Sequence, residues 1–489
     1  MKINYNSIMA KKVISFLIFL ALVGIVYSCN QEISVSPPDA PPPHGYVLID
    51  SKPDGAQIYL DGKNRRRITP DSLTWLETDT YTITLKKELF RDTSISIDAV
   101  DGERKEFFID YTKNPAMRGE INCNGKPDGS EIFLNDSATG KTTPDILQGL
   151  LPGYYKVRYH AQNYRDNTLD VVVSSSNTSE AKTQLVDTTK WMDLNTNTSN
   201  IPTNNLTDIT VDDQNNLWIG TEDNGLVKYD GNTWQIYSPG TSIIQDSKVN
   251  TVNYSVDGTV WAGTKFGLFL LKGSSWIRYN DIKYGSPLAE PYVVDIVNSI
   301  RGDVYVITHT IILNFFDSSG TWKFDNSDFR PTDTLSCMAV DMAGKLYFGT
   351  KDAGLYAGDN TGVQLKTTNS NILGNSISAI AADPSNGVWI GYGSSIATGT
   401  GIDYYNGSFE HYYVIPSNVQ THSIYADNSG MKWIGTNQGL ITFTTATDAK
   451  KYNKETTGLE MNDVRGVVKD KLGRTWIATF GGGLILKKK

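Results

Sequence analysis

Few residues in this chain are of the types that perform acid–base, nucleophilic or metal chemistry. The 489 residues include only five His and three Cys. A lyase or hydrolase needs at least a His or a pair of carboxylates at its site, and the candidates in turn-like segments are His309, Glu222 and Asp352. The neighbours of His309 are threonines, which favours a histidine at a strand end. Convergence of the three side chains would indicate an enzyme, and their separation a non-catalytic protein.

Other signals of metal or cofactor chemistry are missing from the sequence. It contains no His-x-x-x-His pair, no Gly-x-Ser-x-Gly elbow and no phosphate loop. Aspartates next to Pro or Gly, typical of turns that accept local backbone N–H groups, are Asp54, Asp71, Asp128 and Asp145. Asp341 and Asp383 belong to a series with one carboxylate per turn, which suits calcium poorly. We expect no metal and no cofactor.

The charge balance argues against a nucleic-acid partner. The chain has 45 basic and 53 acidic residues, a net charge of −8. Residues 1–28 contain three lysines and no acid, so their removal leaves 42 − 53 = −11. A nucleic-acid surface would require a basic patch, and the two basic runs, residues 65–67 and 487–489, have the length of a solvated loop or tail.

The N-terminus has the pattern of an export signal. Lys11 and Lys12 precede an unbroken apolar run from Val13 to Val26, and translation could begin at Met1 or Met9. The run is too short to span a bilayer, for which a helix needs about 20 residues, and it fits a secretory signal. Residues 26–29, Val-Tyr-Ser-Cys, resemble the bacterial lipoprotein box. That resemblance implies a lipidated Cys29 as the mature N-terminus, with ordinary cleavage as the alternative.

Five prolines between residues 37 and 43 predict an extended tether after Cys29. A lipid followed by such a tether would hold a folded head away from a membrane. The remaining cysteines, Cys123 and Cys337, lie in different repeats and in strand-like stretches. They do not indicate a disulfide framework, and we expect them to be small buried residues.

The first repeat has an offset of 74 residues. Lys52-Pro53-Asp54-Gly55 returns at residues 126–129, and Thr69-Pro70-Asp71 returns at residues 143–145. Apolar and polar residues alternate in each copy between turn residues, which predicts two small β-sandwiches. Pro-Asp-Gly-Ala at residues 53–56, followed by Asp-Gly and Thr-Pro, resembles the PEGA domain, with Ser130 in place of the Ala in the second copy. The resemblance implies repeated modules of an exported protein, with a role in spacing or weak binding.

The second repeat occurs seven times after residue 190. An aromatic residue heads a short motif, continued by an apolar residue, a small residue and usually Thr, at spacings of 43, 44, 42, 42, 44 and 43 residues; the aromatic residues are Trp218, Trp261, Tyr305, Tyr347, Trp389, Trp433 and Trp476. Six residues earlier stands Asp or Ser, and three residues earlier Gly or Asn, which predicts a hairpin between an innermost and a second strand. Seven such units predict a seven-bladed β-propeller. The tryptophans should pack blade against blade rather than stack on sugars.

The predicted ring needs its two ends to meet. The seventh unit ends after its third strand, whereas Trp191 to Leu194 precede the first unit and have the pattern of an outer strand. We expect this strand to complete the seventh blade. The Asp-x-x-Gly-x-x-Trp-Ile-Gly-Thr units resemble the two-component regulator propeller, a periplasmic sensing module of hybrid histidine kinases. The third blade departs from the pattern at Ile307, Ile311 and Ile312. Because the sequence carries no kinase, we expect no transmembrane signalling by this chain alone.

The loops between the second and third strands of the blades are the expected ligand face. A mixed ring of charges, amides and aromatic residues in these loops would suit a sugar or a peptide, with solvated loop tips as the alternative. Besides residues 393–401, the ring consists of Glu222, Asp223, Asn224, Lys265, Phe266, His309, Lys351, Asp352, Asn437, Gln438 and Phe480.

The sequence therefore predicts an all-β envelope lipoprotein, periplasmic or surface-exposed. Its expected parts are a signal peptide (1–28), a Pro-rich tether (29–45), two PEGA-like domains (46–115 and 116–187) and a seven-bladed propeller (188–489). The favoured function is non-catalytic binding of a glycan, a peptide or an envelope protein, with lipid insertion of Cys29 as the membrane contact. The alternatives are a propeller lyase or glycan hydrolase, and an accessory sensor for a separate kinase.

Overall fold

The computed structural model describes residues 44–279, 288, 290–309, 313–316, 322–324, 333–358, 363–393 and 401–488. The leader, Cys29 and the predicted tether up to residue 43 lie outside the described residues, as does most of the 393–401 loop, whereas Gly45, the last residue of the predicted tether, already belongs to the first strand. Two compact units divide the chain, and each is considered by itself. Residues up to 121, with 147–154 and 172–179, form the first unit, and residues 122–146, 155–171 and 180–489 form the second.

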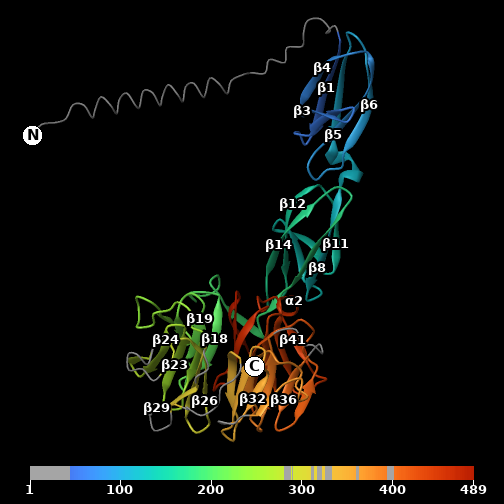
Figure 1. Cartoon of the computed structure of the whole chain (residues 1–489). Helices are drawn as coiled ribbons and strands as arrows, with labels where there is room; N and C mark the ends of the chain where they lie inside the picture. Colours follow the sequence, from blue (N-terminus) through green and yellow to red (C-terminus); the bar gives the residue numbers. More distant parts are fainter. Residues whose placement is uncertain are drawn as a thin grey trace, which may run out of the picture. The chain divides into compact units, whose positions relative to one another are not determined.

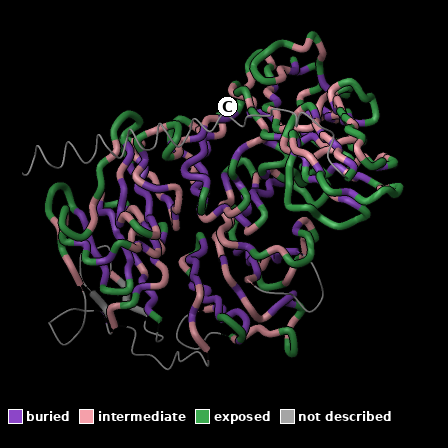
Figure 2. Tube along the Cα trace, turned by 90° about the horizontal axis from the view of Figure 1, so that it is seen from above, coloured by how far each residue is buried: buried purple, intermediate pink, exposed green. Residues whose placement is uncertain are grey.

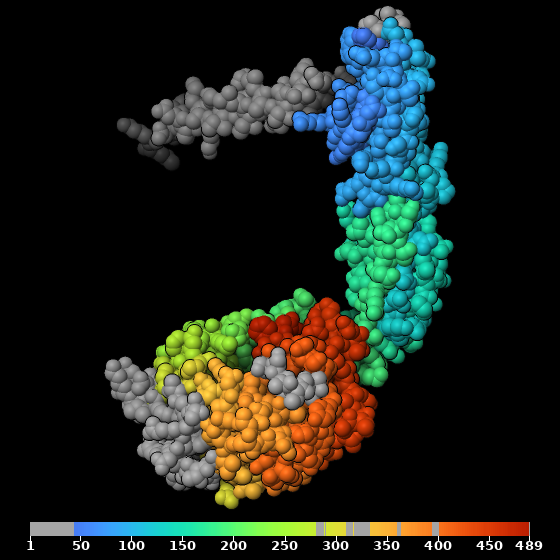
Figure 3. Space-filling model, turned by 45° about the vertical axis from the view of Figure 1, so that its right-hand side comes forward, coloured from blue at the N-terminus to red at the C-terminus, as the bar shows by residue number. Residues whose placement is uncertain are grey.

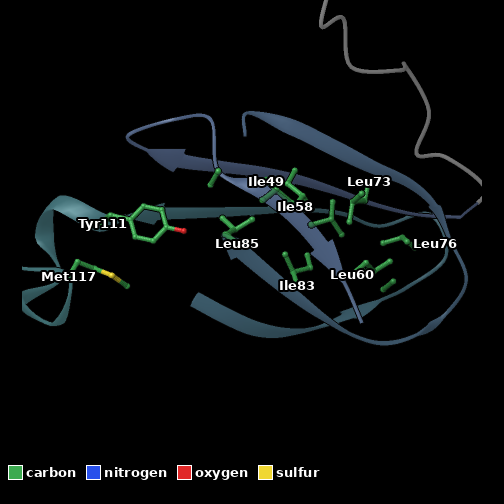
Figure 4. Packing of buried hydrophobic residues seen from close by; sticks show 12 residues of the cluster. Ile49, Ile58, Leu60, Leu73, Leu76, Ile83, Leu85, Tyr111 and Met117 are labelled. Carbon is green, nitrogen blue, oxygen red and sulfur yellow. The ribbon is translucent and has the colours of Figure 1, made fainter. Parts of the chain in front are cut away.

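The first sandwich has seven strands in two sheets (Figure 1). The strands are β1 (Gly45–Lys52), β2 (Gln57–Leu60), β3 (Lys63–Ile68), β4 (Asp71–Leu76), β5 (Asp79–Lys86), β6 (Thr93–Ala99) and β7 (Arg104–Asp110). The sheet orders are β4-β1-β7 and β3-β2-β5-β6. Alternate residues of the strands point inward, as period-two patterning requires, and Ile49, Ile58, Ile83 and Leu85 meet between the sheets with no exposed surface (Figure 4).

Two short 3-10 helices, η1 (Tyr111–Lys113) and η2 (Pro115–Met117), lead to a second sandwich that repeats the first. Its seven main strands start and end 74 residues after their counterparts: β8 (Gly119–Lys126), β9 (Glu131–Leu134), β10 (Ser137–Thr142), β11 (Asp145–Leu150), β12 (Gly153–His160), β14 (Asn167–Val173) and β15 (Thr178–Gln184). Two short strands, β13 (Tyr164–Arg165) and β16 (Val186–Asp187), pair with each other. The internal offset read from the sequence therefore corresponds to a repeated structure.

Seven four-stranded antiparallel sheets follow, each running from an innermost to an outer strand. The first three blades consist of β18 (Leu206–Val211), β19 (Leu217–Thr221), β20 (Leu226–Tyr229) and β21 (Trp234–Tyr237); β22 (Thr251–Tyr254), β23 (Thr259–Thr264), β24 (Gly267–Lys272) and β25 (Ser275–Tyr279); and β26 (Val293–Asn298), β27 (Val304–Thr308), β28 (Leu313–Phe316) and β29 (Trp322–Phe324). The second and third strands of the first two blades are largely buried and the tips of their connections exposed (Figure 2).

The next three blades have the same order. They consist of β30 (Leu335–Val340), β31 (Leu346–Thr350), β32 (Leu355–Ala357) and β33 (Val363–Leu365); β34 (Ile377–Ala382), β35 (Val388–Tyr392), β36 (Ile402–Tyr405) and β37 (Phe409–Tyr412); and β38 (Thr421–Ala426), β39 (Lys432–Thr436), β40 (Gly439–Phe443) and β41 (Lys450–Tyr452). One helical turn, α2 (Lys454–Thr457), stands in the connection to the last blade. The prediction of an all-β chain with a seven-bladed propeller is confirmed.

The seventh blade joins the two ends of the propeller. It contains β42 (Val464–Lys469), β43 (Thr475–Thr479), β44 (Gly483–Lys487) and, as its outer strand, β17 (Trp191–Leu194). Trp191 pairs with Lys487 and Leu194 with Leu484. In Figure 3 the green of the first blade accordingly lies beside the red of the last.

The motif tryptophans are buried between neighbouring blades. Trp218 packs with Val249 and Val260 of the second blade, and Trp476 of the seventh blade packs with Leu206 of the first. The exposed fraction of these two rings is 4% and 3%. Burying a ring of this size stabilises an interface by a few kcal/mol, so the tryptophans are structural.

No helix in the part of the chain that the structure describes has the length and apolar character needed to cross a membrane.

Candidate functional site

The loops between the second and third strands share one end of each blade with the connections that lead into the innermost strand. The first residue after the motif donates its backbone N–H to the carbonyl of the residue before the innermost strand: Glu222 to Asn205 (3.0 Å), His309 to Tyr292 (3.0 Å), Lys351 to Thr334 (3.1 Å), Asn437 to Gln420 (3.1 Å) and Phe480 to Asp463 (2.8 Å). Two sets of loops therefore build one connection face, at the mouth of the central channel.

Most of the sequence-predicted ligand residues on this face are engaged locally. Glu222 forms an ion pair with Lys248 at 2.9 Å, Asp223 accepts a hydrogen bond from Thr203 at 3.3 Å, and Asn224 donates to Asp223 at 2.8 Å. These contacts stay within the connections of the first two blades. They hold loops in shape rather than converge on a ligand.

The residues of the other loops are equally dispersed. Lys265 lies over the ring of Phe266, which is 46% exposed. Asn437 accepts the backbone N–H of Gln420 at 2.9 Å, and Gln438 accepts from Lys451 at 3.4 Å. Lys351 and Asp352 follow strand β31 at exposed positions.

The three possible catalytic residues do not come together. The ring of His309 packs against Tyr292 with a centroid distance of 5.2 Å, within its own blade. Glu222 is paired with Lys248 in the first two blades, and the backbone N–H of Asp352 binds Asp333 in the fourth. The three residues belong to three separate blades, and none of these contacts joins one of them to another.

Four other side chains do converge at the channel mouth, and we call them the Asp463 cluster: His422, Asp463, Arg465 and Phe480. Asp463 Oδ1 lies 2.9 Å from His422 Nδ1, and Arg465 Nη2 donates to Asp463 Oδ2 at 2.7 Å. The Arg465 guanidinium lies 5.3 Å from the centre of the Phe480 ring. Of these four residues, the sequence analysis named only Phe480.

The electrostatics of the cluster fix the charges of its members. Burial acts to raise the pKa of Asp463, but hydrogen bonds from His422 and Arg465 outweigh it and hold that pKa below its ordinary value. The carboxylate is therefore ionised and already neutralised by its own partners. Arg465 Nε is buried and, among the described residues, has no hydrogen-bond acceptor, and Phe480 remains 39% exposed. The Arg465 guanidinium and the partly exposed Phe480 ring therefore lie side by side at the channel mouth.

Comparison of the blades singles out His422 and Arg465. Each stands eleven residues before the aromatic residue of its motif, where four other blades carry a small donor that bonds to a carbonyl of the next blade: Thr207 to Val249 (2.5 Å), Asn250 to Val293 (2.9 Å), Ser336 to Ile377 (2.5 Å) and Ser378 to Thr421 (2.6 Å). In the sixth blade His422 bonds instead to the Asp463 carboxylate of the seventh, and in the seventh blade Arg465 bonds to Asp463 of its own blade. Replacement of a small structural donor by a large polar side chain is expected where a site is built.

One residue further along, two carboxylates border the channel. Asp208 accepts the backbone N–H of Val252 at 2.8 Å and Asp295 that of Met338 at 2.9 Å, so each ties its blade to the next. Burial, and for Asp208 also the neighbouring Asp295, raises the pKa of Asp208 to about 7 and that of Asp295 to about 6.

The fifth blade contains a further polar network. Tyr392 stands where other blades have a threonine that bonds to a loop carbonyl, as Thr221 does to Gly225 at 2.8 Å. Its hydroxyl instead donates to Asp403, which has no exposed surface and also lies 2.7 Å from His411 Nδ1. Burial raises the pKa of Asp403 despite these hydrogen bonds. The network fastens the third and outer strands of that blade.

Metal and thiol chemistry find no support in the described part of the chain. It holds no group of three His, Cys, Asp or Glu side chains arranged to bind a metal ion. Cys123 and Cys337 are buried and are not joined by a disulfide, and burial raises the pKa of both thiols. A buried thiol with a raised pKa is a poor nucleophile.

Comparison with protein families now gives names to two parts of this architecture. Residues 44–113 match the PEGA domain, and residues 200–223 match the two component regulator propeller. The chain carries both modules. The PEGA domain contains strands β1 to β7, and the propeller match spans the start of the first blade. No curated protein matches the chain in sequence.

Solved structures similar to the chain are propeller proteins. Virginiamycin B lyase from Staphylococcus aureus is 16% identical over 61% of this chain and 99% of that chain, with a TM-score of 0.50. The extracellular domain of the hybrid two component system BT4673 from B. thetaiotaomicron is 16% identical over 61% and 40% (TM-score 0.48). PorZ, a surface component of the type-IX secretion system of Porphyromonas gingivalis, is 14% identical over 84% and 67% (TM-score 0.48). At such identities the similarity shows the fold alone.

Proposed function

We propose that this chain is a lipid-anchored envelope protein whose propeller binds a ligand without transforming it. The Asp463 cluster carries the proposal. The Arg465 side chain is 36% exposed and its guanidinium lies beside the partly exposed ring of Phe480, a combination suited to a carboxylate next to an apolar or ring-shaped group. A peptide, an acidic glycan or a protein terminus of the envelope has that chemistry.

The cluster supports binding better than catalysis. Its one carboxylate, Asp463, is ionised and shared between Arg465 and His422. A general base needs a free acceptor, and a general acid a proton to give; both capacities of Asp463 are taken up by its partners. The arrangement fixes a positive group at the channel mouth.

Placement in the envelope has separate support. The leader with Cys29 has the pattern of a lipoprotein signal, and the PEGA domain match agrees with an exported protein. A lipid anchor would keep the propeller at a membrane, periplasmic or surface-exposed, where soluble peptides and glycans can reach it.

Calorimetric titration with short acidic peptides and acidic oligosaccharides tests the binding function. We expect saturable binding of one such class, weakened at least tenfold, about 1.4 kcal/mol or more, in Arg465→Gln and in Phe480→Ala. Arg301→Gln is the matched control, because Arg301 lies exposed in a turn at the opposite end of the third blade.

Two results would overturn this function. Unchanged affinity of Arg465→Gln for the bound ligand would remove the Asp463 cluster from the site. Conversion of the ligand during incubation, detected by mass spectrometry and abolished in His422→Ala, would establish a lyase or hydrolase instead.

A further inference from the structure

Trp75 of the PEGA domain occupies a backbone position that favours glycine. Its φ is +64°, a left-handed conformation that is costly for a bulky residue. The counterpart 74 residues later in the second sandwich is Gly149, with φ +71°. Both residues stand in strands of the same length and order, β4 and β11. The two sandwiches therefore share the conformation, and only the first places an aromatic side chain there.

A β-bulge directs Trp75 outward. Strand β4 pairs with β1 at Leu73 with Val47 and at Leu76 with Gly45, so that Thr74 and Trp75 both face Tyr46. A bulge of this kind bends the strand and re-aims a side chain. The indole is 66% exposed and belongs to no part of the sandwich core. Trp75 therefore gains no core packing that would offset the strain of its backbone. Backbone strain that no packing offsets is a feature of functional positions.

Three strands contribute to an aromatic row around this indole. The His44 ring lies 5.4 Å from Trp75, centroid to centroid. Tyr46 stands next on β1, and Arg104 of β7, its register partner, lies over the Tyr46 ring at 5.5 Å. We call His44, Trp75, Tyr46 and Arg104 the Trp75 row.

The second sandwich provides an internal comparison. At the positions of the Trp75 row it has Arg118, Gly149, Glu120 and Thr178. Strands, sheet orders and turn positions are otherwise repeated. Because the fold forms without the row, the aromatic residues of the first sandwich are not required by the architecture.

The chemistry of the row fits a neutral sugar chain. Exposed aromatic faces carry partial negative charge and attract the polarised C–H groups of a pyranose ring. Donors and acceptors for its hydroxyl groups stand alongside: Arg104 paired to Glu106 at 3.0 Å, and the exposed Thr74. Acidic Glu77 and Glu106 interleave with the basic residues, which disfavours an anionic lipid surface. We propose that the Trp75 row is a binding site for a neutral polysaccharide, separate from the propeller site.

Electrophoresis of the full chain through native gels tests the site. The gels contain hydroxyethyl cellulose, glycol chitin, xylan or galactomannan. We expect at least one polymer to retard the wild type, and Trp75→Gly to raise the dissociation constant at least tenfold. Trp75→Phe should keep most of the binding, because it keeps a ring. Tyr154→Ala is the matched control, since Tyr154 is a 73% exposed aromatic residue of the second sandwich, and it should bind like the wild type.

The melting temperature of Trp75→Gly is the control for misfolding. Gly adopts a positive φ without cost, so Trp75→Gly should melt no lower than the wild type. Retardation unchanged in Trp75→Gly but lost in Arg465→Gln would assign the polysaccharide to the propeller and overturn the proposal. Absence of retardation by all four polymers would overturn it too, as would sedimentation of the wild type with neutral or anionic vesicles that is lost in Trp75→Gly.

Discussion

Two aspartates of the first blade that are only four residues apart, Asp208 and Asp212, have different roles. Asp212 holds a hairpin and also accepts the indole N–H of Trp218 at 2.9 Å. Asp208, four residues earlier, borders the channel and ties the first blade to the second. The turn role follows from the local spacing of Asp, Gly and Trp and was predictable. The channel role depends on the next blade, which local spacing does not describe.

Protonation of Asp208 should make the propeller more stable at low pH. Its pKa is about 7 in the folded protein and near 3.9 in the unfolded chain. Between these values the folded state binds more protons, so the free energy of unfolding falls as pH rises. Asp208→Asn removes this dependence. At pH 5 the wild type should gain stability from the protonated Asp208, and at pH 8 it should not. From pH 5 to pH 8 the stability of Asp208→Asn relative to the wild type should therefore rise, by about 1 to 3 kcal/mol in the free energy of unfolding, and its relative melting temperature should rise with it.

Thermal unfolding at a series of pH values measures this effect. Asp212→Asn is a suitable comparison, because Asp212 lies in a turn outside the channel. A constant difference between Asp208→Asn and the wild type across the pH range would contradict the assignment of a raised pKa to Asp208.

Only one residue of the Asp463 cluster could be predicted from the sequence. Phe480 was named because it follows a motif directly. His422 and Arg465 were missed because they lie at the start of the innermost strands β38 and β42 rather than in the loops after the motif, and their meeting at Asp463 depends on the angle between the sixth and seventh blades. A signal was nevertheless present: both replace the small polar residue that Thr207 and Ser378 represent in other blades.

At the scale of elements, repetition made the architecture readable. The 74-residue offset predicted two sandwiches, and seven aromatic motifs predicted seven blades. The sequence did not reveal the bulge at Trp75, since Leu73 and Leu76 alternate plausibly in a regular strand too. Positive φ is evident from the sequence where Gly or Asn stands, as at Gly149, and a Trp gives no such signal.

Strand β17 should contribute strongly to the stability of the propeller. Trp191 is 5% exposed and packs edge-on against Tyr452 of the sixth blade, with centroids 5.4 Å apart. Trp191→Ala removes a buried indole and should cost about 3 to 5 kcal/mol. Denaturant unfolding followed by circular dichroism gives the value. Trp75→Ala, at an exposed position, should cost no stability; an equal loss in both variants would refute a special role for β17.

The whole molecule is expected to depend on Cys29 for its location. Cys29→Ala removes the acceptor of the proposed lipid, whose chains hold a protein to a membrane by about 0.8 kcal/mol per buried CH₂. We expect the variant to move from the membrane to the soluble fraction after ultracentrifugation, whereas Cys123→Ala, at a buried position, should remain with the membrane. Equal membrane recovery of Cys29→Ala and the wild type would exclude the lipid anchor.

The pairing of β17 with β44 also governs the order in which the molecule can be made. Lys488 bonds to Thr188 across 300 residues of sequence, and contacts between distant segments form slowly because a long loop must close first. During synthesis, β17 emerges early and waits with an open hydrogen-bonding edge until β44 follows. Such an edge readily pairs with strands of other chains. Assembly of the propeller therefore has a vulnerable interval, whose length is set by the rate of chain elongation.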